Sequence, residues 1–112
     1  MLNEFNSYNR KRQRKVNNIC MKKRTEKSIM LEVSTRLSYA GWRCKRVPPS
    51  IYASKGWCDV IAIRKGMVLF IEFKGEKGKL SPEQKVFGRD IEDAGGNYIV
   101  CRKWEDILEA IT

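Results

Sequence analysis

The sequence predicts one α/β domain in which a mixed β-sheet is flanked by helices. Three observations support this. Apolar residues recur at helical spacing in some segments and alternate, or run continuously, in shorter ones. These segments follow one another in the order α-β-β-β-α-β-α. A chain of 112 residues is long enough for one hydrophobic core and too short for two ordinary domains.

The first predicted elements are a helix over residues 25–39 and a strand over residues 42–47. Thr25 is a favourable N-cap, and Gly41 supplies a stop signal. Between them, apolar residues recur at helical spacing at Ile29, Met30, Val33, Leu37 and Ala40. Two prolines end the strand, and residues 48–56 are expected to form a loop.

The clearest local pattern is a β-hairpin. Two strand-like runs, residues 57–64 and 67–74, flank the pair Lys65-Gly66, and a two-residue connection containing Gly is typical of hairpins. With this turn, the residue numbers of opposed partners add to 131, so Asp59 faces Glu72. Cross-strand partners have Cβ atoms about 5 Å apart, so the two carboxylates are expected to lie close together.

The second half of the chain predicts a helix, a strand and a helix. Ser81-Pro82 followed by Gln84 has the features of a helix start, and Gly95-Gly96 ends that helix. Residues 97–101 predict a short strand. A final helix over residues 104–111 places Trp104, Ile107, Leu108 and Ile111 on one side.

The net charge of +10 is unevenly distributed. Residues 1–24 contain eight lysines and arginines against one acid and lack apolar periodicity, so they predict a flexible basic arm preceding a domain of residues 25–112. Such an arm favours a polyanionic partner, with nucleic acid the first candidate, although a purely solubilising tail has the same composition. No apolar run is long enough to cross a membrane, and the N-terminus lacks a signal region, so a cytoplasmic protein is expected.

The chain has no histidine and no Cys-x-x-Cys pair. Zinc fingers, zinc hydrolases and histidine-based hydrolases are therefore disfavoured, and the four cysteines are expected to be reduced core residues. Any general base or metal ligand must then come mainly from carboxylates and lysine.

Asp59, Glu72 and Lys74 form the best candidate site, because Lys74 shares a strand face with Glu72. Two neighbouring carboxylates suit Mg²⁺ or Mn²⁺, which bind oxygen ligands and substrate phosphates and generate a nucleophilic water. The alternative is a solvated ion-pair network at the strand ends. Residues alone leave these two interpretations equally open.

The segment Gly56-Trp57-Cys58-Asp59, followed after twelve residues by Glu72-Phe73-Lys74, resembles the PD-(D/E)XK nuclease superfamily. Together with Thr25-Glu26-Lys27 and Ser81-Pro82-Glu83-Gln84, it resembles the VRR-NUC branch in particular. The resemblance spans about residues 25–104 and departs from the family at Cys58, where proline is usual. It implies a restriction-endonuclease-like core and a metal-dependent DNA endonuclease, selective for branched DNA like a Holliday-junction resolvase. It also implies a homodimer of phage origin that needs no small-molecule cofactor.

The same resemblance implies roles for individual residues. Asp59 and Glu72 would be metal ligands, joined by the Phe73 carbonyl, and Lys74 would be the catalytic lysine. Gln84 would lie near the active site, although a helix-capping role also fits it.

The acid contributed by the first helix is either Glu26 or Glu32. Glu26 is preferred as a metal ligand because it shares a stripe with Met30 and Val33, which predicts that it points toward the core, whereas Glu32 falls on a more polar stripe. The predicted phosphate contacts are basic residues of the first strand and of the loop after the hairpin, namely Arg43, Lys45, Arg46, Lys77 and Lys79. Trp42 and Trp57 are expected in the core or at an interface rather than as base-stacking platforms.

Two rival functions stay open at this point. One is a nuclease of the same superfamily that acts on flaps, ends or plain duplex. The other is a non-catalytic nucleic-acid-binding module that uses the basic arm.

Overall fold

A computed structural model describes residues 24–48 and 55–112. Its elements are α2 (Glu26–Tyr39), β1 (Arg43–Arg46), β2 (Val60–Arg64), β3 (Met67–Phe73), α3 (Pro82–Asp93), β4 (Asn97–Cys101) and α4 (Trp104–Ile111). The order α-β-β-β-α-β-α is confirmed. The predicted basic arm and most of the loop after β1 lie outside the described residues.

The four strands form one sheet in the order β1-β2-β3-β4. Strand β2 is antiparallel to both β1 and β3, whereas β4 pairs parallel to β3, so the sheet is mixed as predicted. The hairpin register is also confirmed, since Arg64 pairs with Met67 and Val60 pairs with Ile71. Lys65 and Gly66 both adopt positive φ, which matches the turn to the twist of the strands.

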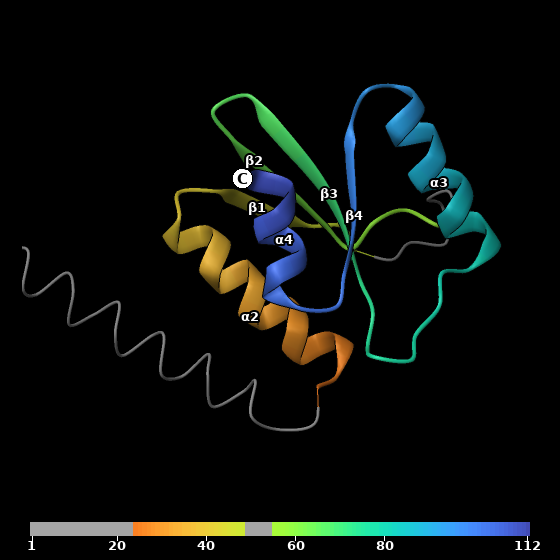
Figure 1. Ribbon diagram of the computed structural model, residues 1–112, viewed down its shortest axis with the longest axis horizontal. Coiled ribbons are helices and arrows are strands. Elements are labelled where there is room, and N and C mark those ends of the chain that lie inside the picture. The colour runs from red at the N-terminus through yellow and green to blue at the C-terminus, as the bar shows by residue number, and fades with distance from the viewer. Residues whose placement is uncertain (1–23, 49–54) are drawn as a thin grey trace, which may run out of the picture.

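Helices lie on both faces of the sheet. Helices α2 and α4 lie side by side on one face, whereas α3 lies on the other face beside β4 (Figure 1). The core lies under α2 and α4, where alternate residues of the strands, such as Val60, Leu69 and Ile71, pack with Val33 and other helix residues. Each such buried aliphatic side chain stabilises the fold by about 2 kcal/mol. The opposite face of the sheet carries Glu72 together with apolar residues such as Ile61 and Phe70.

The two predicted helix starts are confirmed in detail. Thr25 and Ser81 are the N-caps of α2 and α3, and each forms a reciprocal capping box with the third helical residue, Ser28 and Gln84 respectively. Of the cysteines, Cys58 and Cys101 are buried and unoxidised, as expected, while Cys44 is half-buried. Trp42 is buried, which also agrees with its predicted place in the core.

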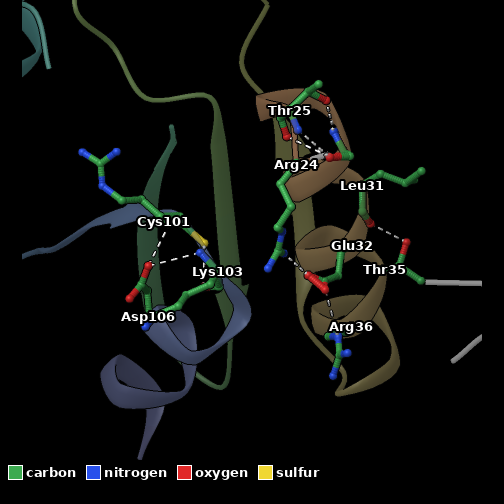
Figure 2. Close-up of polar contacts among 11 residues, drawn as sticks. Arg24, Thr25, Leu31, Glu32, Thr35, Arg36, Cys101, Lys103 and Asp106 are labelled. Atoms are coloured by element: carbon green, nitrogen blue, oxygen red, sulfur yellow. Dashed lines mark hydrogen bonds and ion pairs between the residues drawn. The ribbon is translucent and has the colours of Figure 1, made fainter. Parts of the chain in front are cut away.

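The predicted orientation of α2 is wrong in one respect. Its buried stripe consists of Ile29, Glu32, Val33 and Leu37, whereas Glu26 is exposed. Glu32 is only 2% exposed because two arginines neutralise it: Arg24 lies 2.5 Å from Oε1 and Arg36 lies 3.9 Å from Oε2 (Figure 2). The guanidinium of Arg36 also lies 5.5 Å from the ring centroid of Trp104, which connects this buried ion pair to α4. Glu32 therefore stabilises the packing of helices, on the opposite side of the sheet from Glu72.

Candidate active site

The two predicted carboxylates meet where the hairpin strands end. The backbone N–H of Asp59 donates to the carbonyl of Ile71 at 2.9 Å, although Ile71 is already the register partner of Val60, so the regular pairing ends at Val60 and the chain bends at Asp59. Asp59 still lies close enough to Glu72 for its charge to raise the pKa of that carboxyl. Cys58, between Trp57 and Asp59, is buried.

Asp59 is held in a fixed orientation by the neighbouring strand. Its Oδ2 accepts a hydrogen bond of 2.8 Å from the backbone N–H of Phe73. The Phe73 side chain is buried in the core, so this backbone is firmly placed. One carboxylate oxygen of Asp59 therefore points at the end of β3, beside Glu72.

Glu72 is the most unusual group of the site, since its side chain is only 3% exposed. Its Oε1 accepts a hydrogen bond of 2.7 Å from Gln84 Nε2 and lies 3.7 Å from Lys74 Nζ. Its Oε2 is buried and has no hydrogen-bond partner among the described residues. A buried carboxylate oxygen without a donor is costly, so this atom is expected to bind something absent from the protein itself.

The electrostatics of the site follow from this crowding of acids. Burial raises the pKa of Glu72 most, the negative charges of Asp59 and Glu26 add to this and Lys74 opposes it, so that the pKa rises from an ordinary 4.5 to about 7. Burial, followed by the charges of Glu72 and Asp59, raises the pKa of the Cys58 thiol to about 11. A cation between the carboxylates would offset both the burial of negative charge and the repulsion between Asp59 and Glu72.

Gln84 connects the start of α3 to the site. Its Oε1 accepts from the backbone N–H of Ser81 at 2.8 Å, and its Nε2 donates to Glu72. The two roles predicted for this residue, helix capping and a place beside the site, are thus combined in one side chain.

The remaining predicted site residues are less uniformly placed. Glu26 is exposed, but it is close enough to affect the charge of Glu72. Arg43 and Lys45 pair with Ile63 and Ile61 and so share the face of Glu72, whereas Arg46 pairs with Val60 and belongs to the opposite face. Lys77 and Lys79 are exposed in the loop between β3 and α3.

The pattern of the sequence did not reveal Tyr98. This residue of β4 pairs with Phe70 of β3, and its ring packs where a Cβ on Gly88 would lie, only 2.4 Å from the ring. Its hydroxyl is buried and has no hydrogen-bond partner among the described residues, and burial followed by the charge of Glu72 raises its pKa. Only the parallel pairing of β4 with β3 brings Tyr98 here, and no short turn in the sequence fixes that register.

The donor set fits a hard divalent cation. In the described part of the chain, no three His, Cys, Asp or Glu side chains converge on one point, so an all-protein metal cage is absent there. Mg²⁺, however, keeps several of its waters and needs only one or two carboxylates. Asp59 and the unpartnered Glu72 Oε2 satisfy that requirement.

Comparison with known families agrees with this arrangement. The family model of the VRR-NUC domain matches residues 52–104, a range that begins before the candidate Asp59 and ends after β4. The chain carries a VRR-NUC domain. VRR-NUC domains are nuclease domains of the PD-(D/E)XK type, so the chain is assigned to that class of DNA-cleaving hydrolase.

Two solved structures show the same fold. One described as a VRR-NUC domain aligns with a TM-score of 0.66 at 19% identity, over 79% of this chain and 96% of that chain. A second, described as a VRR-NUC domain protein, aligns with a TM-score of 0.57 at 21% identity, over 80% and 87% of the two chains. The Holliday junction resolvase Hjc of Archaeoglobus fulgidus aligns with a TM-score of 0.49 at 23% identity, over 67% and 65%. A comparison with curated proteins found no match. In the described residues of this VRR-NUC protein, no helix has the length and apolarity needed to cross a bilayer.

Proposed function

We propose that this VRR-NUC protein is a DNA endonuclease that hydrolyses phosphodiester bonds with the help of Mg²⁺ or Mn²⁺. The observation that carries the proposal is the state of Glu72. One of its oxygens accepts a hydrogen bond from Gln84 and lies near Lys74, while the other is buried and has no donor in residues 24–48 and 55–112. Asp59 places a second negative charge beside the same carboxylate.

Each residue then has a defined task. Asp59 and Glu72 would hold the cation, with the Phe73 carbonyl and Glu26 as further proposed oxygen ligands. When bound, the cation supplies charge neutralisation at the phosphate and a water of lowered pKa. The ammonium of Lys74, only 13% exposed at its side chain, stabilises the negative charge that builds up on the phosphate. Gln84 keeps the other Glu72 oxygen engaged, so the carboxylate cannot turn away.

The substrate is proposed to be branched DNA, cut by a homodimer. A four-way junction has approximate two-fold symmetry, which a symmetric dimer with one site per protomer would match. The proposed phosphate contacts are exposed basic residues on or beside the face of the site, namely Arg43, Lys45, Lys77 and Lys79. Arg46 points to the other face, so it is proposed to contact phosphate from the edge of the sheet. A cytoplasmic place of action and a phage origin remain predictions of the sequence.

The test is a cleavage assay on a panel of four-way junctions, flaps and linear duplexes, each with Mg²⁺, Mn²⁺ or a chelator. Asp59→Ala, Glu72→Ala and Lys74→Ala are each expected to lower the cleavage rate by about 100-fold or more while DNA binding survives. Glu76→Ala, which removes an exposed acid from the adjacent loop, is the matched control and should cleave normally.

Symmetric cuts confined to junctions, made by a species that sediments as a dimer, are the expected result. Equal cutting of linear duplex would instead favour the flap, end or duplex nuclease. Metal-dependent cleavage that survives Glu72→Ala would refute the site. Binding without any cleavage would favour the non-catalytic nucleic-acid-binding module.

A further inference from the structure

A groove of about 480 Å³ lies beside the first turns of α3. Its lining combines the apolar side chains of Trp57, Val86 and Phe87 with the charged groups of Lys55, Glu83 and Asp90. The volume falls within the range of about 300–1,000 Å³ that is usual for small-ligand sites. None of the residues proposed for catalysis lines it.

The aromatic side of the groove is packed against other rings and is also exposed to solvent. The rings of Trp57 and Phe87 have centroids 5.0 Å apart, and Phe87 in turn contacts the rings of Phe70 and Tyr98 edge-on. Trp57 is nevertheless 46% exposed and Val86 is 57% exposed. A large aromatic surface is therefore held in place from one side and presented to solvent on the other, so Trp57 lies outside the core, and its exposure is compatible with the interface position that the sequence also predicts.

The groove adjoins the candidate active site. Trp57 precedes Asp59 by only two residues, so the groove and the candidate site are neighbours along the chain. On α3, Phe87 lies one turn after Gln84, which contacts Glu72. Gly56 fixes this geometry, because a Cβ there would lie 2.5 Å from the backbone of Glu83, so only glycine lets the Trp57 segment approach α3 so closely.

The charges around the groove favour a base over a phosphate. Glu83 and Asp90 are both exposed acids in its lining and repel a phosphate, but carboxylates accept hydrogen bonds from the amino groups of bases. Lys55 supplies a cation for a phosphate at the rim. Stacking on an aromatic ring is available to every base, but only when that base has left the duplex stack.

We infer that this groove binds one unpaired nucleobase of the DNA strand whose phosphate lies at Asp59 and Glu72. The inference rests on the proposed nuclease function for its substrate, and it adds how the protein recognises a branched or distorted duplex. Intact duplex offers no free base to the groove, whereas branch points and bulges do.

The binding test uses the full chain in a chelator, so that no cleavage occurs. The probes are a short duplex with one extrahelical cytosine and the same duplex with an abasic analogue in place of that nucleotide. Cytosine is chosen because its amino group can donate to Glu83 or Asp90. Wild type is expected to bind the cytosine probe about five- to 150-fold more tightly than the abasic probe, the range of one base–aromatic stack.

Three variants assign the preference to Trp57. Trp57→Ala should abolish it, and Trp57→Phe should keep most of it. Leu31→Ala, which truncates a side chain of similar exposure on α2, should leave it intact. Circular dichroism shows whether each variant is folded, and the two probes on wild type test the inference without any variant.

Equal affinity of wild type for the two probes would overturn the inference, as would a folded Trp57→Ala variant that still prefers cytosine. So would a Trp57→Ala variant that changes the sedimentation of the protein but not its preference, because the groove would then be a protein–protein contact. Since the preference is measured without metal, it can hold when the cleavage assay fails, and cleavage can occur when the preference is absent.

Discussion

Replacing Glu72 by glutamine tests how much the buried carboxylate lowers the free energy of unfolding in the absence of metal. The side chain is 3% exposed, one of its oxygens has no partner among the residues described, and a second acid lies beside it, so the metal-free protein ionises it only at a cost in stability. Glutamine has nearly the same shape but no charge. Its amide oxygen can still accept the hydrogen bond from Gln84.

The sign and size of the effect follow from the raised pKa of Glu72, from 4.5 to about 7. Because the folded-state pKa lies above the unfolded one, the folded protein has its full stability below the unfolded pKa and loses part of it as the pH rises through the folded pKa. At about 1.4 kcal/mol per pH unit, the difference between 4.5 and about 7 corresponds to about 3 kcal/mol. In a chelator, Glu72→Gln is therefore expected to be about 2–3 kcal/mol more stable than wild type at about pH 8.5 and equal to it at about pH 4.

Urea unfolding followed by circular dichroism at both pH values measures these free energies. Glu76→Gln, an exposed acid nearby, should show no pH-dependent gain. Adding Mg²⁺ at about 100 times its dissociation constant should restore about 2.7 kcal/mol to wild type and nothing to Glu72→Gln. A variant that gains no stability at the higher pH would refute the interpretation of Glu72 as a strained, cation-binding acid.

Three further substitutions test the packing around the site by the same urea measurements. Gly56→Ala places a Cβ 2.5 Å from the backbone of Glu83 at a residue with φ of 91°, so a loss of about 2–4 kcal/mol is expected; a neutral result would mean that this segment and α3 separate easily. Gly88→Ala brings a methyl group 2.4 Å from the Tyr98 ring and should cost about 1–3 kcal/mol, whereas a stabilised variant would contradict the packing. Tyr98→Phe removes a buried hydroxyl that has no partner in the part of the chain the structure describes, so stability should stay equal or rise by about 1 kcal/mol; a clear loss would show that the hydroxyl does have a partner, such as a bound water.

The hairpin and its register could be predicted because the determining signal is local. Lys65-Gly66 forms a two-residue turn, and that turn alone fixes which residues oppose each other. The proximity of Asp59 and Glu72 follows from the register. The start of α3 is equally local, since Ser81 and Gln84 cap it within one turn.

What could not be predicted depends on contacts between distant segments. Glu32 falls on the more polar stripe of its helix in the sequence, yet the side chain is buried, because Arg24 and Arg36 both form ion pairs with it. Apolar periodicity contains no information about such ion pairs, and it therefore predicts Glu26 as the core-facing acid of α2. Tyr98 could not be predicted because its position depends on the parallel register of β4 against β3. These two strands are connected through α3 and not by a short turn that would fix their register.

Gln84 has a consequence for motion in this protein. Its oxygen holds the first turn of α3 closed and its nitrogen holds Glu72, so unwinding that turn and releasing the carboxylate are one event. Hydrogen exchange of the backbone amides at the beginning of α3 therefore reports how firmly the Glu72 carboxylate is held. Their exchange with solvent deuterium should slow when a divalent cation binds, although none of them is a ligand.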